Sequence, residues 1–77
     1  MTRLPILDAK KVEKLLMNLG FERVRQKGSH VFYRHPDGRT TTLPHHRGRD
    51  LARPLLREIL REIELTPEDI LDMLKDV

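Results

Sequence analysis

The chain has 77 residues, with 15 Lys and Arg, 12 Asp and Glu and no cysteine. This length allows a single domain, residues 1–77, without a deep cofactor cleft. The absence of cysteine excludes a disulfide framework, a thiolate zinc site and a cysteine nucleophile. No apolar stretch is long enough for a membrane span or a signal peptide, so we expect a cytoplasmic protein that uses neither membrane nor cofactor.

The net charge of +3 is unevenly distributed along the chain. Residues 22–53 carry eight basic and three acidic residues, a net charge of +5, whereas residues 54–77 have a net charge of −4. All four histidines and seven arginines lie in the basic stretch. Arginine suits bidentate contacts to phosphate, so the stretch favours an anionic polymer as partner. The alternative is a solvated charged surface without a polyanionic partner.

The first predicted element is an amphipathic helix that begins after Asp8, a good N-cap residue. Its apolar residues recur at i, i+3, i+4 and i+7 and form one face: Val12, Leu15, Leu16 and Leu19. Gly20 then supplies a helix stop. The spacing therefore predicts one helix packed on its apolar side.

The next stretch changes to the two-residue period of β-strands. Residues 21–27 and 30–35 are rich in β-branched and aromatic side chains, and Gly28-Ser29 between them predicts a hairpin. A turn at residues 36–38 leads to a third strand over 39–43. The three strands are expected to form an antiparallel meander.

Two helices are predicted after the strands. Pro54 suits a first helical turn, and a single apolar stripe follows it, formed by Leu55, Leu56, Ile59, Leu60 and Ile63. Residues 66–69 have the pattern of a helix cap. They precede a short third helix whose apolar face holds Ile70, Met73, Leu74 and Val77.

This order of elements predicts a two-layer α+β domain with a three-stranded antiparallel sheet. The arrangement is α-β-β-β-α with a short third C-terminal helix. The apolar stripes of the helices must be buried, so the helices are expected to cover one face of the sheet and leave the other open. Such an arrangement resembles the double-stranded RNA-binding domain (dsRBD) fold.

His30 is the candidate for chemistry because it begins the second strand directly after Gly28-Ser29. Imidazole has an ordinary pKa near 6.5 and can exchange a proton at neutral pH. On RNA, His30 would take the proton of a 2′-hydroxyl or protonate the leaving oxygen, while Lys27, Arg34 or a loop arginine stabilises the charge on phosphorus. The alternative is a surface or hydrogen-bonded structural histidine.

Two other kinds of active site are disfavoured. A metal site needs convergent ligands, but the side chains of the adjacent His45 and His46 would point in opposite directions on an extended backbone, and no HExxH spacing is present. The acidic pairs at 62/64 and 68/69 fall in predicted helices, where solvation or a helix N-terminus accounts for them. We therefore expect neither a metal site nor a carboxylate enzyme.

Four segments together resemble the HicA (YcfA-like) family of toxins from toxin–antitoxin pairs. They are Leu-Gly-Phe at 19–21, Gln-Lys-Gly-Ser-His at 26–30 with aromatic residues after it, Leu-Pro-His-His at 43–46, and the leucine-rich stretch 51–60. The resemblance implies a dsRBD-like fold, metal-independent cleavage of messenger RNA, and neutralisation by a HicB-type antitoxin. It also implies that His30 is catalytic and that His46 is a second histidine of the family pattern.

The expected RNA contacts lie in the basic stretch, and they are Arg23, Arg25, Lys27, Ser29, Arg34, His46, Arg47 and Arg49. One departure concerns the second helix, where the family commonly has Gly-Thr and this chain has Pro54-Leu55. The change removes a hydroxyl and a backbone N–H that could meet a phosphate. The alternatives to an RNA-cleaving toxin are a non-catalytic RNA-binding module of the same fold and an interaction module that uses its acidic C-terminal helices.

Overall fold

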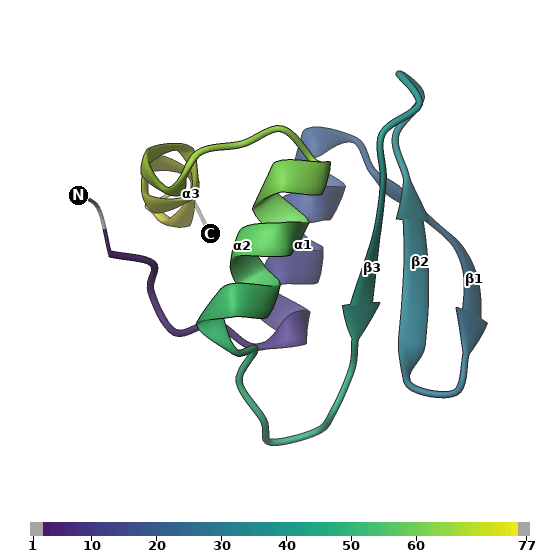
Figure 1. Ribbon diagram of the computed structural model, residues 1–77. Helices are drawn as coiled ribbons and strands as arrows, with labels where there is room; N and C mark the ends of the chain where they lie inside the picture. The colour runs from purple at the N-terminus through teal and green to yellow at the C-terminus, as the bar shows by residue number, and fades with distance from the viewer. Residues whose placement is uncertain (1–2, 76–77) are drawn as a thin grey trace.

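The computed structural model describes residues 3–75, in which one helix, three strands and two helices follow in the predicted order (Figure 1). The elements are α1 (Ala9–Leu19), β1 (Glu22–Lys27), β2 (His30–Arg34), β3 (Thr40–Pro44), α2 (Arg53–Glu62) and α3 (Pro67–Leu74). The strands form an antiparallel sheet in the order β1-β2-β3. The predicted α+β arrangement is confirmed.

The sheet has one face covered by α1 and α2 and one open face (Figure 1). On β2, Val31 and Tyr33 are buried beneath the helices. Alternation along the strand therefore places His30, Phe32 and Arg34 on the open face. The predicted division of β2 between two faces is confirmed.

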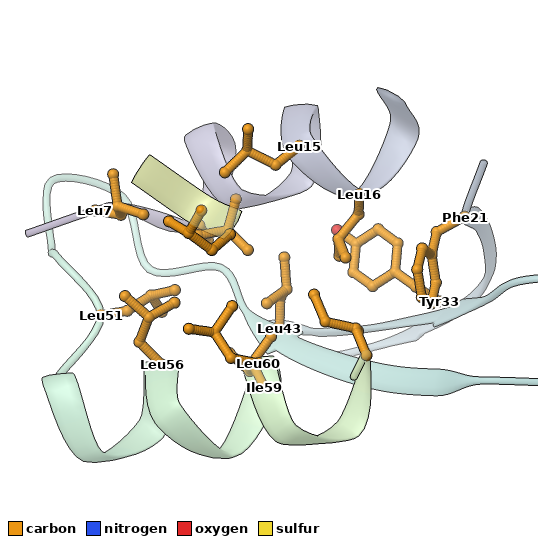
Figure 2. Close-up of a cluster of buried hydrophobic side chains, with 14 of the residues drawn as sticks. Leu7, Leu15, Leu16, Phe21, Tyr33, Leu43, Leu51, Leu56, Ile59 and Leu60 are labelled. Carbon is orange, nitrogen blue, oxygen red and sulfur yellow. The ribbon is translucent and has the colours of Figure 1, made fainter. Parts of the chain in front are cut away.

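Helix α1 begins where Asp8 caps it, with the Asp8 carboxylate accepting a hydrogen bond from the Lys11 backbone N–H at 2.9 Å. Val12, Leu15 and Leu16 on its apolar face are buried. Figure 2 shows Leu16 pointing toward Tyr33, in the core that α1 shares with the sheet and α2.

Helix α2 begins at Arg53, with Pro54 in its first turn. The predicted stripe is buried at four positions, Leu56, Ile59, Leu60 and Ile63. The fifth, Leu55, is 36% exposed, so its placement in the stripe was wrong. Successive helical residues are rotated by about 100°, and the neighbour of the buried Leu56 therefore turns toward solvent.

Helix α3 has the predicted cap, in which Thr66 and Asp69 each bond the other's backbone N–H. Ile70 is buried, and Met73 and Leu74 pack against the core. Val77, the last predicted member of this face, lies outside the described residues. Figure 1 shows α3 on the side of α1 and α2 away from the strands. The expectation that all the helices cover the sheet was therefore wrong for α3.

The segment before α1 also joins the core, which periodicity did not predict. Leu4 and Leu7 are buried, and the Leu7 carbonyl accepts a hydrogen bond from the Leu51 N–H at 2.7 Å. The Arg53 side chain donates to the Leu4 carbonyl at 3.0 Å. These contacts fix the end of the loop between β3 and α2.

A β-bulge interrupts β1. Arg23 pairs with Tyr33 and Arg25 pairs with Phe32, so Val24 is an extra residue between them. Without the bulge, Arg23 and Arg25 would lie on the same face. The bulge instead places Arg23 on the helix side and Arg25 on the open side.

None of the helices within residues 3–75 has the length and apolar character that a membrane crossing requires.

Candidate active site

His30 lies at the tip of the β1-β2 hairpin and is exposed. It pairs directly with Lys27 across the two-residue turn Gly28-Ser29. Gly28 has a φ of +60°, as the first residue of a tight hairpin turn of type II′ requires. The turn therefore places an imidazole and an ammonium group side by side on the sheet.

The loop after β3 starts beside this hairpin. Pro44 pairs with His30, and the next residue, His45, donates its backbone N–H to the Ser29 carbonyl at 2.7 Å. His46 and Arg47 follow and are exposed. The hairpin turn and the start of the loop are thus held together by backbone contacts at one end of the sheet.

A shallow groove of about 390 Å³ runs between this loop and the start of α1. It is lined by Asp8, Ala9, Lys10, His45, His46, Arg47 and Gly48. The Asp8 carboxylate caps α1, so Lys10 and Arg47 supply the charges that are free to meet a ligand. An anionic strand fits such a groove.

Behind the loop, four side chains form a hydrogen-bonded network. The Tyr33 hydroxyl donates to the Glu13 carboxylate and contacts His45 Nε2 at 2.8 Å. Arg23 Nε donates to the same Glu13 oxygen at 2.6 Å. The network joins α1, β1, β2 and the loop, and Arg23 is held by it on the helix side of the sheet.

The network alters two ionisation equilibria. Burial alone would raise the pKa of Glu13, but hydrogen bonds from Tyr33 and Arg23 outweigh it, so the pKa of Glu13 lies below its ordinary value. Burial, reinforced by the Glu13 carboxylate, raises the pKa of Tyr33 well above its usual range. At neutral pH the pair is therefore a carboxylate and a protonated phenol.

His35 occupies the opposite end of the sheet. Its Nε2 contacts the Leu19 carbonyl at 3.0 Å, and its ring packs edge-on against Phe21 with centroids 5.1 Å apart. These contacts join the end of α1 to the turn after β2. His35 is thus a structural histidine, remote from His30.

The structure brings together only part of the expected RNA contacts. Lys27, Ser29, His46 and Arg47 lie at the His30 end, and Arg49 follows in the same loop. Arg25 lies farther along the open face, with its guanidinium 4.6 Å from the Phe32 ring centre. Arg34 ends β2 at the far end, and Arg23 is engaged by Glu13.

Sequence reasoning missed three residues of this region: Lys10, Glu13 and Tyr33. Lys10 reaches the groove because α1 begins beside the loop, and Glu13 meets Tyr33 across 20 positions of sequence. No local sequence pattern predicts contacts between residues so far apart in the chain.

Within residues 3–75, no three His, Asp or Glu side chains gather closely enough to hold a metal ion.

Comparison with protein families gives a match to a model described as the HicA toxin of bacterial toxin–antitoxin systems. It covers residues 9–65, more than half of the chain. The chain belongs to the HicA toxin family. No curated protein matches the chain.

Membership of the HicA family implies an antitoxin as partner. The matched region runs from the first residue of α1 to just beyond α2, so it includes the hairpin, the loop and every residue of the groove except Asp8. At Pro54-Leu55, α2 starts after Ala52 without a side-chain cap, and Leu55 is partly exposed there. The start of α2 thus presents an apolar side chain to solvent.

Proposed function

We propose that this HicA family member is a metal-independent endoribonuclease that cleaves messenger RNA and uses His30 as a general acid or base. The observation that carries the proposal is an exposed histidine at a hairpin tip, paired with Lys27 on one side and with Pro44 on the other, just before the loop that lines a basic groove. Family membership supports a toxin role.

The chemistry needs no group beyond the RNA and the protein side chains. The 2′-oxygen attacks the neighbouring phosphorus as its proton leaves, and the bond to the 5′-oxygen breaks as that oxygen gains a proton. His30 performs one of these proton transfers, and water accepts or supplies the proton of the other. Lys27 and Arg47 stabilise the extra negative charge on the phosphoryl oxygens.

The groove between α1 and the loop is the proposed binding site of the RNA strand. Lys10 and Arg47 line it and can each neutralise a phosphate, and His46, the residue before Arg47, lines it as well. A HicB-type antitoxin would silence the toxin by covering His30 and presenting acidic groups to these cations. The proposed substrate and the proposed antitoxin therefore compete for the same end of the molecule.

The decisive experiment compares the wild-type protein with His30→Ala on a purified RNA transcript. We expect cleavage to fall by about 10²- to 10⁴-fold, the contribution typical of a positioned proton-transfer group. Because His30 is exposed, the melting temperature should stay near that of the wild type.

A matched substrate tests the nucleophile. The same RNA with a 2′-O-methyl group at the cleaved position should bind and remain intact. Undiminished cleavage by His30→Ala would overturn the assignment of His30. A wild-type protein that binds RNA in a gel shift but forms no product would instead be a non-catalytic RNA-binding module.

A further inference from the structure

We propose that His45 is a positioning residue, held by Tyr33 and Glu13, that sets the place of the His30 turn and of the loop carrying His46. The inference rests on the proposed function and assigns His45 a role distinct from that of His30. Three observations carry it: the direction of the hydrogen bonds, the backbone contact of His45, and its contrast with His35.

The direction of the hydrogen bonds is fixed by Glu13. A carboxylate only accepts, so the Tyr33 hydroxyl donates its proton to Glu13 and must accept from the other partner. His45 Nε2, at 2.8 Å from the Tyr33 oxygen, therefore carries a hydrogen and donates it. This bond fixes the ring of His45, and Nε2 is not available to take a proton from RNA.

The orientation of the network persists over the range of pH in which an RNA-cleaving histidine works. Burial and the Glu13 carboxylate keep the Tyr33 phenol protonated by raising its pKa. Hydrogen bonds keep Glu13 charged by lowering its pKa. Arg23, whose Nη2 lies 2.6 Å from the Glu13 carboxylate, holds that carboxylate from the other side.

The backbone of His45 carries the effect of this anchor to the site. Its N–H donates to the Ser29 carbonyl, one residue before His30, at 2.7 Å. The following residue, His46, lines the groove. A shift of the His45 ring would therefore move both the histidine proposed for chemistry and the wall of the groove proposed for RNA.

His35 provides an internal comparison because it is buried to the same degree. Its side chain is 20% exposed and that of His45 is 21% exposed, and each ring is held by a hydrogen bond through Nε2. His35, however, is anchored to the end of α1, far from the hairpin tip. Removal of either ring deletes a part-buried hydrogen bond through Nε2, and for His35 also the bond that Nδ1 accepts from the Asp37 N–H, but only removal of the His45 ring should disturb the site.

The test uses Tyr33→Phe, His45→Ala and His45→Gln in the full chain, with His35→Ala as the matched control. Kinetics on RNA should show that kcat of Tyr33→Phe and of His45→Ala falls by about 10- to 100-fold, the effect of a small misplacement, while KM changes little. Glutamine keeps a donor near the position of Nε2, so His45→Gln should recover most of the kcat. His35→Ala should lower the melting temperature but leave kcat of the folded protein unchanged.

A second measurement reads the position of the turn without relying on catalysis. In ¹⁵N–¹H spectra, the amide signals of Ser29 and His30 should move in Tyr33→Phe and His45→Ala and should stay in place in His35→Ala. If His45→Ala does not fold, Tyr33→Phe alone provides the test, because this substitution removes only a hydroxyl.

The outcomes separate this inference from the proposed function. Wild-type kcat and unmoved Ser29 and His30 signals in Tyr33→Phe and His45→Ala would overturn the positioning role, while the His30→Ala result would still stand for the function. Full activity of His30→Ala would overturn the function, and the amide signals alone would then decide whether His45 positions the turn. A kcat that glutamine fails to restore would contradict the role of the Nε2 donor.

Discussion

Single residues of the same type differ here in what surrounds them. All four histidines lie in one short basic stretch, yet His35 and His45 are held by hydrogen bonds to the body of the protein, whereas His30 and His46 are exposed at one end. The arginines divide in the same way, with Arg23 engaged by Glu13 and Arg47 in the groove. The contacts that a side chain makes within the protein, and not its residue type, determine whether it has a structural role or is available to bind a ligand.

Glu13 is the residue whose removal should reveal the network thermodynamically. In the folded protein the pKa of Glu13 lies below its ordinary value of 4.5. The carboxylate therefore stabilises the fold above that pH, and its contribution disappears as the pH falls through the lowered pKa. At neutral pH we expect Glu13→Gln to lower the free energy of unfolding by about 1 to 2 kcal/mol.

Urea titrations of the wild type and Glu13→Gln at about pH 7 and about pH 3 test this expectation. The difference in free energy of unfolding should shrink at the acidic pH, because below the ordinary pKa of 4.5 the unfolded chain takes up a proton at Glu13 more readily than the folded chain does. Glutamine still offers an oxygen to Tyr33, so the comparison isolates the charge. A difference that is the same at both pH values would contradict the ionic role of Glu13.

At the scale of elements, periodicity predicted the helices and strands because each depends on its own side chains. Val12, Leu15 and Leu16 are buried at the expected spacing, and Thr66 caps α3 as its sequence indicates. The same reasoning missed the burial of Leu4, which depends on contacts with residues far along the chain.

The candidate site could likewise be predicted only where it depends on residues close together in the sequence. The Gly28-Ser29 turn and the exposure of His30 could be predicted, because a hairpin is a local structure. The groove and the network could not, since they arise where the loop meets α1 and Tyr33. The bulge at Val24, which separates Arg23 from Arg25, also has no signature in a strict two-residue alternation.

The β1-β2 hairpin allows a prediction in which stability and activity separate. A Cβ at Gly28 would meet no atom within 4 Å, but the φ of +60° is strained for any other residue. Gly28→Ala should therefore cost about 1 to 2 kcal/mol of stability. It should also reduce RNA cleavage, because relief of the strain would move Ser29 and His30.

Gly38→Ala is the matched control, since Gly38 also has a positive φ and open space around it but lies in the turn at the other end of the sheet. Thermal melting should show both variants destabilised, and cleavage measured well below both melting temperatures should fall only for Gly28→Ala. Equal activity of the two variants would show that the geometry of the hairpin tip does not matter for the reaction.

On the scale of the whole molecule, charge is separated between two ends. The hairpin tip, the loop and the start of α1 gather Lys10, Lys27 and Arg47, whereas α3 has three acidic residues and no basic one, Glu68, Asp69 and Asp72. Figure 1 shows α3 on the far side of α1 and α2 from the sheet. This polarity would orient an approaching RNA strand toward His30 and away from the acidic helix α3.

The salt dependence of RNA binding measures which cations take part. A variant that no longer neutralises one phosphate should show a slope of log K against log salt that is shallower by about 0.7 to 0.9. In a His30→Ala background, which keeps the RNA intact, Lys10→Ala and Arg47→Ala should each weaken binding and flatten the slope by this amount. Lys75→Ala should change neither quantity, because Lys75 follows α3 and lies 3.5 Å from Asp72. If Lys10→Ala behaved like Lys75→Ala while Arg25→Ala flattened the slope, the RNA would lie on the open face of the sheet and not in the groove beside α1.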